Sequence, residues 1–189
     1  MTFRDYLNAW KKINFVDNLE NWSLKLVKFL SFSENNKKIF IMGNGGSAAN
    51  ASHIANDFTY GYGDKERRLN IECLASNSSV LTCLANDIGY DDIFSYQIEN
   101  KAKQGDLVIV LSGSGNSSNI LNAINISKKM KLKTFGILGF DGGKAKSLLD
   151  DYIIIPGQDM QLSEDMQLVI AHGSMRMMDP RNTKWKKLQ

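Results

Sequence analysis

The 189-residue chain lacks the features that define several large protein classes. Its only cysteines, Cys73 and Cys83, do not form a CxxC motif, which excludes a disulfide framework and predicts two buried, reduced thiols. No apolar stretch has the length that crosses a bilayer, and no signal peptide follows Met1. We therefore expect a cytoplasmic protein without a membrane partner.

Neither sign of charge is in large excess. The formal net charge is only +3, and the basic excess lies in the last residues, at Arg181, Lys184, Lys186 and Lys187. We interpret 179–189 as a solvated basic tail and expect no nucleic-acid partner. The remaining composition is typical of one globular domain, so 1–189 is predicted to be a single domain with a substantial core.

The usual nucleotide-binding motifs are missing, because neither GxxxxGK[ST] nor a GxGxxG with its acidic partner occurs. Two other small-residue loops are present, GNGGS at 43–47 and SGSGNS at 112–117, and each follows an apolar strand-like run. Loops of this kind at helix starts let backbone N–H groups approach an anion. Either loop alone fits an ordinary turn with a serine cap. Together they favour a ligand that carries phosphate on a polyhydroxylated body.

Apolar runs and helical periodicity alternate along the chain, which predicts an α/β fold with a five-stranded parallel sheet covered on both faces. Strands are expected at 38–42, 69–74, 107–111, 134–138 and 152–155. Helices are expected at 47–59, 79–85, 92–102, 117–129, 144–149 and 162–178. Both glycine-rich loops then fall at the carboxyl ends of strands, where such sheets bind ligands.

The N-terminal segment 3–30 has helical spacing, with one break expected near 14–21. It carries more large apolar side chains than one stripe on a small domain needs. We therefore interpret 1–31 as a helical region that packs against a partner subunit.

The only two histidines are candidates for chemistry. His53 and Asp57 are four residues apart on one predicted helix face, and His172 follows Glu164 by about two turns. Structural or surface roles are common for such residues. Near a phosphorylated sugar they instead suit proton transfer, or the binding of a divalent metal such as zinc.

Several segments together resemble the SIS-domain phosphosugar isomerases and, among them, the phosphoheptose isomerases. They are GNGGS with His53, NDIGYDDIFSYQ at 86–97, the serine-rich loop, DGGK at 141–144, and 164–172. The resemblance covers about 1–178. It implies a flavodoxin-like three-layer α/β/α sandwich and a homotetramer with active sites between subunits.

The resemblance also implies roles for individual residues. The phosphate would be held by Ser112, Ser114 and Ser117, and the sugar would be contacted by Asn44, Gly45 and Ser47. The pocket would further be lined by Asp87, Ser95 and Gln97. One zinc per subunit would be bound by His53, Asp57, Glu164 and His172.

The implied reaction converts sedoheptulose 7-phosphate to D-glycero-D-manno-heptose 7-phosphate through an enediol, for lipopolysaccharide, capsule or another heptose glycan. Our hypothesis assigns the carbon-bound proton to Asp57 as base and the oxygen-bound protons to His172. The chain departs from the family in having Asp57 where glutamate is usual and Glu164 where glutamine is usual. The alternatives are an isomerase of another ketose phosphate, and a non-catalytic SIS module that binds a sugar phosphate or a replication-initiator protein.

Overall fold

A computed structural model of the chain describes residues 2–13, 15–33, 37–61, 68–179 and 181. Five parallel strands form one sheet in the order β2-β1-β3-β4-β5. Their bounds are β1 Ile39–Gly43, β2 Ile71–Cys73, β3 Leu107–Ser112, β4 Lys133–Leu138 and β5 Asp151–Ile154. The register aligns Gly43 with Leu111, so the loops that follow β1 and β3 lie beside each other at one edge of the sheet. The predicted five-stranded parallel sheet is confirmed.

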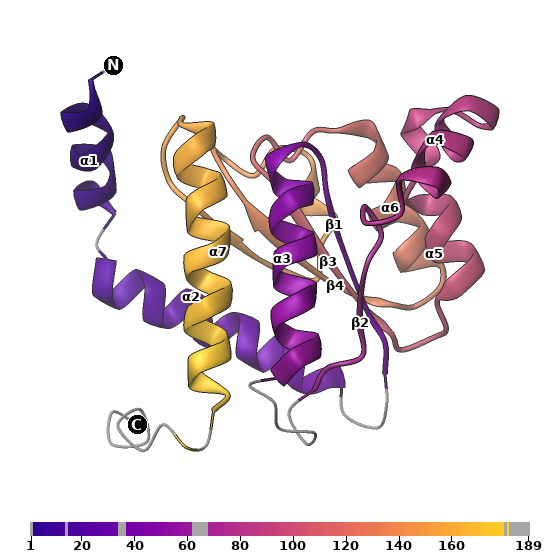
Figure 1. Ribbon diagram of the computed structural model, residues 1–189, viewed down its shortest axis with the longest axis horizontal. Helices are drawn as coiled ribbons and strands as arrows, with labels where there is room; N and C mark the ends of the chain where they lie inside the picture. Colours follow the sequence, from indigo (N-terminus) through magenta and orange to yellow (C-terminus); the bar gives the residue numbers. More distant parts are fainter. Residues whose placement is uncertain (1, 14, 34–36, 62–67, 180, 182–189) are drawn as a thin grey trace.

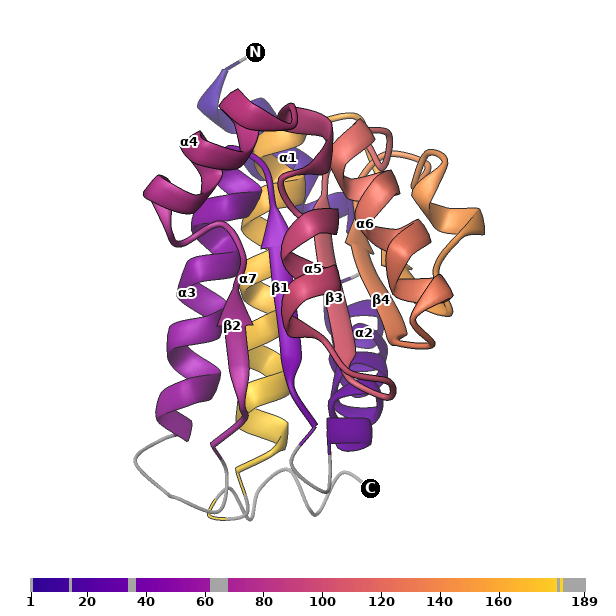
Figure 2. The same ribbon diagram turned by 90° about the vertical axis from the view of Figure 1, so that its right-hand side faces the viewer.

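Helices cover the sheet on both faces (Figures 1 and 2). One layer contains α2 (Phe15–Leu30), α3 (Gly46–Tyr60) and α7 (Met160–Met177), and the other contains α5 (Ser95–Lys101) and α6 (Ser118–Lys129). Alternation along β1 explains the two cores, because Ile39 and Ile41 face α3 and α7 while Phe40 and Met42 face α5 and α6. The three-layer sandwich follows from this alternation.

Three predicted helices differ in detail from the structure. The segment 92–102 divides into a 3₁₀ turn, η4 (Tyr90–Asp92), and the short α5. The expected helix at 144–149 is a single 3₁₀ turn, η5 (Ala145–Ser147). The N-terminal segment comprises two helices, α1 (Phe3–Lys12), which has Ile13 as its C-cap, and α2, which begins at Phe15, so the segment is broken once as expected. A further 3₁₀ turn, η1 (Ser31–Ser33), follows α2.

The expectation that both thiols are buried is wrong for one of them. Cys73 is buried, whereas Cys83 is exposed on α4 (Ser78–Asp87), a helix with no buried residue. The Cys83 thiol donates to the Asp87 carboxylate at 3.5 Å, and this contact raises the pKa of Cys83. Of the predicted basic tail, only residues 179 and 181 are described; Lys184, Lys186 and Lys187 lie outside the described residues.

Helix α1 leaves large apolar side chains in solvent. It has no buried residue, and Phe3 is 75% exposed and Leu7 43% exposed. Its inner face carries Tyr6, whose hydroxyl donates to the Asp165 carboxylate on α7. Partial burial and this carboxylate both raise the pKa of Tyr6. No helix in the described part of the chain combines the length and the apolarity that a membrane span requires.

Candidate functional site

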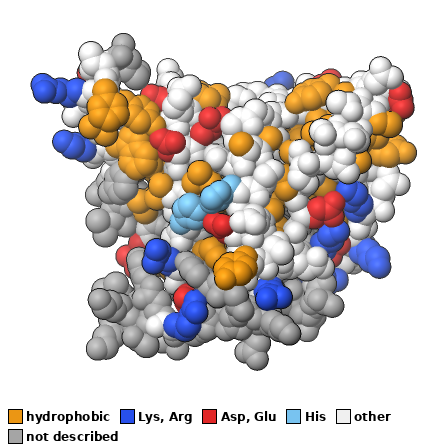
Figure 3. All heavy atoms as spheres, viewed as in Figure 1, with side chains coloured by type: hydrophobic (Ala, Val, Ile, Leu, Met, Phe, Trp, Pro, Cys, Tyr) orange, Lys and Arg blue, Asp and Glu red, His pale blue; other side chains and the backbone are white. Residues whose placement is uncertain are grey.

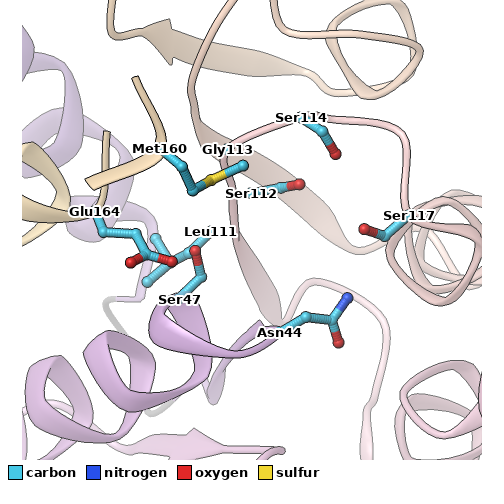
Figure 4. A pocket seen from close by; sticks show the side chains of 9 residues that line it. All are labelled: Asn44, Ser47, Leu111, Ser112, Gly113, Ser114, Ser117, Met160 and Glu164. Atoms are coloured by element: carbon cyan, nitrogen blue, oxygen red, sulfur yellow. The ribbon is translucent and has the colours of Figure 1, made fainter. Parts of the chain in front are cut away.

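A pocket lies at the carboxyl edge of the sheet, between the loops that follow β1 and β3 and the first turns of α7 (Figure 4). It encloses about 100 Å³. The lining residues are Asn44, Ser47, Leu111, Ser112, Gly113, Ser114, Ser117, Met160 and Glu164. Five of the predicted substrate-binding residues are therefore brought together in one place.

The serine-rich loop keeps hydroxyls and helix-start amides available to an anion. The Ser112 hydroxyl accepts from the Gly115 N–H at 3.0 Å, which fixes the turn. Ser117 caps the N-terminus of α6 but makes no side-chain capping bond, so its hydroxyl, which lines the pocket, is not used to cap the helix. Because the N-terminus of α6 also carries partial positive charge, this end of the pocket suits a phosphate group.

The loop after β1 is held by amide side chains. Asn44 and Asn119 exchange two hydrogen bonds of 2.9 Å, and the Tyr90 hydroxyl donates to Asn44 at 3.1 Å. Gly45 is the N-cap residue of α3 and is exposed. The Ser47 hydroxyl accepts from the Gln167 amide at 3.1 Å. These bonds position Asn44 and Ser47 on opposite sides of the α3 start.

Helix α7 is hydrogen-bonded to α3, and its first turns form one wall of the pocket. The Asn50 amide donates to the Gln167 side chain and to the Glu164 carbonyl, each at 2.9 Å. Glu164 sends its carboxylate into the pocket (Figure 4). The carboxylate rests against Gly46, where an added Cβ would lie 2.5 Å from the Glu164 Cδ. The missing side chain at position 46 therefore makes room for this carboxylate.

A second constellation lies on the outer faces of α3 and α7 (Figure 3). His53 Nε2 and His172 Nε2 are 3.1 Å apart, and each is 3.2 Å from Asp57 Oδ2. The two imidazoles are about half exposed, at 49% and 48%, and the Asp57 side chain is 25% exposed. This His53–Asp57–His172 triad is the group of potential metal ligands that the described residues bring together.

The spacing of the triad suits a metal ion. Ligand atoms 2.0–2.1 Å from a tetrahedral zinc lie about 3.3 Å from one another, close to the 3.1 and 3.2 Å separations seen here. Two neutral imidazoles and a carboxylate are a frequent donor set for zinc. The triad therefore fits a divalent metal with at least one coordination position left open.

Glu164 does not join the triad within one chain. It precedes His172 by eight residues on α7, which corresponds to roughly 12 Å along the helix axis. The group of potential ligands in the described residues contains His53, Asp57 and His172 but not Glu164. The structure thus separates the four residues that the resemblance grouped at one zinc.

Known proteins of similar sequence identify the family of this chain. The SIS-domain family matches residues 17–139. A phosphoheptose isomerase from Aliarcobacter butzleri is 39% identical over 146 residues, which are 77% of each chain, and one from Helicobacter pylori strain P12 is 40% identical over 139 residues, 74% of this chain and 72% of the relative. The chain belongs to the phosphoheptose isomerase family of SIS-domain proteins.

Two solved structures share the fold of this chain. The phosphoheptose isomerase of Neisseria gonorrhoeae superposes with a TM-score of 0.81 at 27% identity, over 92% of both chains. The phosphoheptose isomerase of Francisella tularensis has the same fold, with a TM-score of 0.83 at 24% identity over 95% of this chain and 99% of that one.

Besides Gly45, three predicted substrate-binding residues are not among those that line the pocket. The Gln97 amide is buried and donates to the Leu74 and Ile93 carbonyls, at 3.0 and 2.9 Å. The Ser95 hydroxyl donates to Asp92. Asp87 is exposed at the end of α4, where it accepts from Asn86 and Cys83. Within one chain these side chains stabilise local structure, and their contact with substrate stays a prediction.

Sequence reasoning missed two groups at the site. Met160 extends over Gly113 and covers the serine-rich loop, so an added Cβ at Gly113 would lie 2.9 Å from the Met160 Cε. Asn119 orients Asn44 from the first turn of α6. The Asp159 cap that starts α7 could have indicated Met160, because it fixes where the helix begins. No local pattern indicated Asn119, whose role depends on the pairing of β1 with β3.

Proposed function

We propose that this protein is an aldose–ketose isomerase that converts sedoheptulose 7-phosphate to D-glycero-D-manno-heptose 7-phosphate and so serves heptose biosynthesis. The observation that carries the proposal is the pocket itself, which joins a phosphate-binding loop to a carboxylate in a chain of the phosphoheptose isomerase family. Lipopolysaccharide or capsule as the destination, and a cytoplasmic location, rest on the family resemblance alone.

The proposed binding mode orients the sugar by its phosphate. Ser112, Ser114 and Ser117 surround the phosphate at the start of α6, where hydroxyls and backbone N–H groups can donate to it. Asn44 and Ser47 lie between this end and Glu164, so they suit the sugar hydroxyls. The reacting carbons, at the opposite end of the sugar from its phosphate, then extend toward α7.

The reaction itself needs one proton moved between neighbouring carbons. A base removes a proton from C1 as the C1–C2 double bond forms, and the C2 oxygen takes up a proton, which gives the enediol. Return of a proton to C2 and loss of the O1 proton give the aldose. We propose that His172 moves the oxygen-bound protons when no metal occupies its Nε2, because its imidazole is half exposed and is oriented by Asp57.

A divalent metal, if held by His53, Asp57 and His172, would polarise the sugar carbonyl and stabilise negative charge on its oxygen. The donor set and spacing support this assignment. Zinc is the metal that we propose, one per subunit, since two imidazoles and a carboxylate at these separations suit tetrahedral coordination.

We further propose a homotetramer in which the triad of one subunit completes the pocket of another. Three observations support this arrangement. The pocket of one chain encloses about 100 Å³, less than the 300 Å³ and above that is typical of ligand sites. The triad lies roughly 12 Å from Glu164 along α7. Helix α1 presents exposed apolar side chains suited to a subunit interface.

The test is an NMR time course of purified protein with sedoheptulose 7-phosphate, run with added zinc and with a chelator. We expect the anomeric signal of an aldoheptose phosphate to appear with zinc and to grow more slowly with the chelator. A second variant, Ser117→Ala, removes one proposed phosphate donor and should raise KM more than it lowers kcat. Binding of the sugar without turnover would instead support a non-catalytic SIS module, and turnover of a different ketose phosphate alone would change the substrate.

A further inference from the structure

A chain of side-chain hydrogen bonds joins α7 to α3 beside the pocket. Its central residue is Gln167 of α7, which is fully buried, and its ends are Asn50 and Ser47 of α3. The core around it is apolar, with Ala51 of α3 and Met166 of α7 in the same cluster. An apolar side chain of similar size could fill this volume without the desolvation that a buried amide requires. The amide therefore points to a role beyond packing.

The direction of each bond in this chain follows from one backbone carbonyl. The Glu164 carbonyl can only accept, so the Asn50 atom that lies 2.9 Å from it is the amide nitrogen. The same nitrogen is 2.9 Å from the Gln167 side chain, whose atom there must be the acceptor oxygen, Oε1. The Gln167 nitrogen then faces Ser47 and donates to its hydroxyl oxygen at 3.1 Å. The orientation of both amides is thereby determined.

This direction decides what Ser47 offers to a ligand. Its hydroxyl oxygen accepts from Gln167, its hydrogen-bond partner in the described part of the chain, so its own proton is left to donate. Ser47 is only 4% exposed and lines the pocket (Figure 4). Without the Gln167 bond, a serine hydroxyl on a helix can also turn and donate to a backbone carbonyl of its own helix. The bond therefore favours an O–H that points to an oxygen lone pair in the pocket.

We propose that Gln167 is a positioning residue that holds the Ser47 hydroxyl as a hydrogen-bond donor to the sugar phosphate. The inference rests on the proposed function, in which Ser47 contacts the sugar. Gln167 occupies the acceptor side of the hydroxyl, so the O–H is oriented before the sugar binds. Asn50 acts one step further back, because its amide determines which end of Gln167 faces Ser47.

The main experiment is a double-mutant cycle of Gln167→Met and Ser47→Ala in the full-length protein with zinc, with sedoheptulose 7-phosphate as substrate. Methionine keeps the length of Gln167 but donates no hydrogen bond. Each single variant should lower kcat/KM about 3- to 10-fold, the effect of one hydrogen bond. The double variant should fall no further than Ser47→Ala alone, because Gln167 acts only through that hydroxyl. Bound zinc should be the same in all of these variants.

Asn50→Asp reverses the chain without altering either partner of its last bond. An aspartate has no N–H for the Gln167 oxygen, so the Gln167 amide should turn its nitrogen toward position 50 and its oxygen toward Ser47. The Ser47 proton then points to Gln167 instead of the pocket. We expect kcat/KM to fall about 3- to 10-fold in the wild-type background and to stay unchanged in the Ser47→Ala background. The lost bond to the Glu164 carbonyl is common to both backgrounds, so their comparison isolates the effect on Ser47.

Thr134→Val is the matched control for the loss of a buried hydrogen bond. Thr134 is fully buried near the amino end of β4, at the opposite edge of the sheet from the pocket, and exchanges hydrogen bonds with Asp150. This variant should lower Tm and keep wild-type kcat/KM.

Two results would overturn the inference. Losses that multiply in the double variant, to about 10- to 100-fold, would show that Gln167 and Ser47 act independently. Wild-type kcat/KM in either single variant would show that the oriented hydroxyl does not serve the substrate.

Failure of the proposed function would look different. Wild-type protein that binds sedoheptulose 7-phosphate without converting it would overturn the isomerase, and the same cycle measured as Kd by calorimetry would then decide the role of Gln167. Wild-type protein that neither binds nor converts this sugar would overturn both.

Discussion

Replacement of Gly115 by alanine tests whether the serine-rich loop depends on a close backbone crossing. Gly115 has φ +63°, and an added Cβ would lie 2.5 Å from the Gly142 carbonyl carbon and 3.1 Å from the Gly143 nitrogen. These are backbone atoms, which cannot move away as a side chain would. The crossing is also joined by hydrogen bonds from Ala145 N–H to the Gly115 carbonyl and from Lys144 N–H to Asn116. Gly115→Ala must therefore shift one loop or the other.

The expected loss of stability combines three contributions. A left-handed conformation costs an alanine roughly 1–2 kcal/mol. Relief of the overlap by backbone movement costs about 1–3 kcal/mol, by analogy with overpacked cores. The smaller conformational entropy of the unfolded variant offsets about 0.4–1 kcal/mol. The free energy of unfolding should thus fall by about 1–5 kcal/mol, which lowers Tm by roughly 2–20 °C for a domain of this size.

The assay is thermal unfolding at fixed protein concentration, with and without inorganic phosphate. Wild-type protein should gain stability with phosphate, and Gly115→Ala should lose most of that gain because its loop is displaced. The control is Gly157→Ala, which has φ +114° but open space around its Cβ, so it has the backbone penalty alone and keeps the phosphate effect. A Gly115→Ala variant that melts like Gly157→Ala and keeps the full phosphate effect would refute the reasoning.

Two further predictions concern charge and metal. Burial alone would raise the pKa of Glu72, but the ammonium groups of Lys101 and Lys38 outweigh it and hold that pKa below the ordinary value of 4.5. Glu72→Gln should therefore lower the free energy of unfolding by up to about 1 kcal/mol at neutral pH. In urea titrations, this difference from wild type should disappear as the pH falls below about 4.5. His53→Gln removes one triad donor, so zinc affinity measured by equilibrium dialysis should fall at least about 100-fold while Tm without metal is unchanged; equal zinc binding would exclude the triad as the metal site.

Much of the fold was predictable because its strands are buried on both faces. The runs at 39–42 and 107–111 are continuously apolar and are followed by glycine or serine, and the structure has β1 and β3 within one residue of the expected bounds. The helix expected at 92–102 was less predictable. The Asp92 side chain accepts from the Ser95 hydroxyl, a local bond that competes with a continuous helix and separates η4 from α5.

The candidate site shows the same division between local and tertiary information. The serine-rich loop is predictable because strand, loop and helix start are contiguous in the sequence. The triad joins α3 to α7, and only the pairing of His53 with Asp57 follows from helical spacing. The family resemblance predicts that Ser95 and Gln97 contact the ligand. In the structure the Gln97 amide instead donates to two backbone carbonyls, and the sequence pattern alone did not indicate these bonds.

The separation of Glu164 from His172 leads to a last prediction, on how the site is assembled. The two residues lie on one helix roughly 12 Å apart, too far to act on neighbouring carbons of one substrate within a single chain. If Glu164 of one subunit acts with the triad of another, co-expressed Glu164→Gln and His172→Gln chains should complement each other. Half of the pockets and half of the triads remain intact in such mixed oligomers, so about a quarter of wild-type turnover should return. Turnover that stays at the level of the separate variants, in mixed oligomers verified by two affinity tags, would exclude a shared site and require α7 to move within one chain.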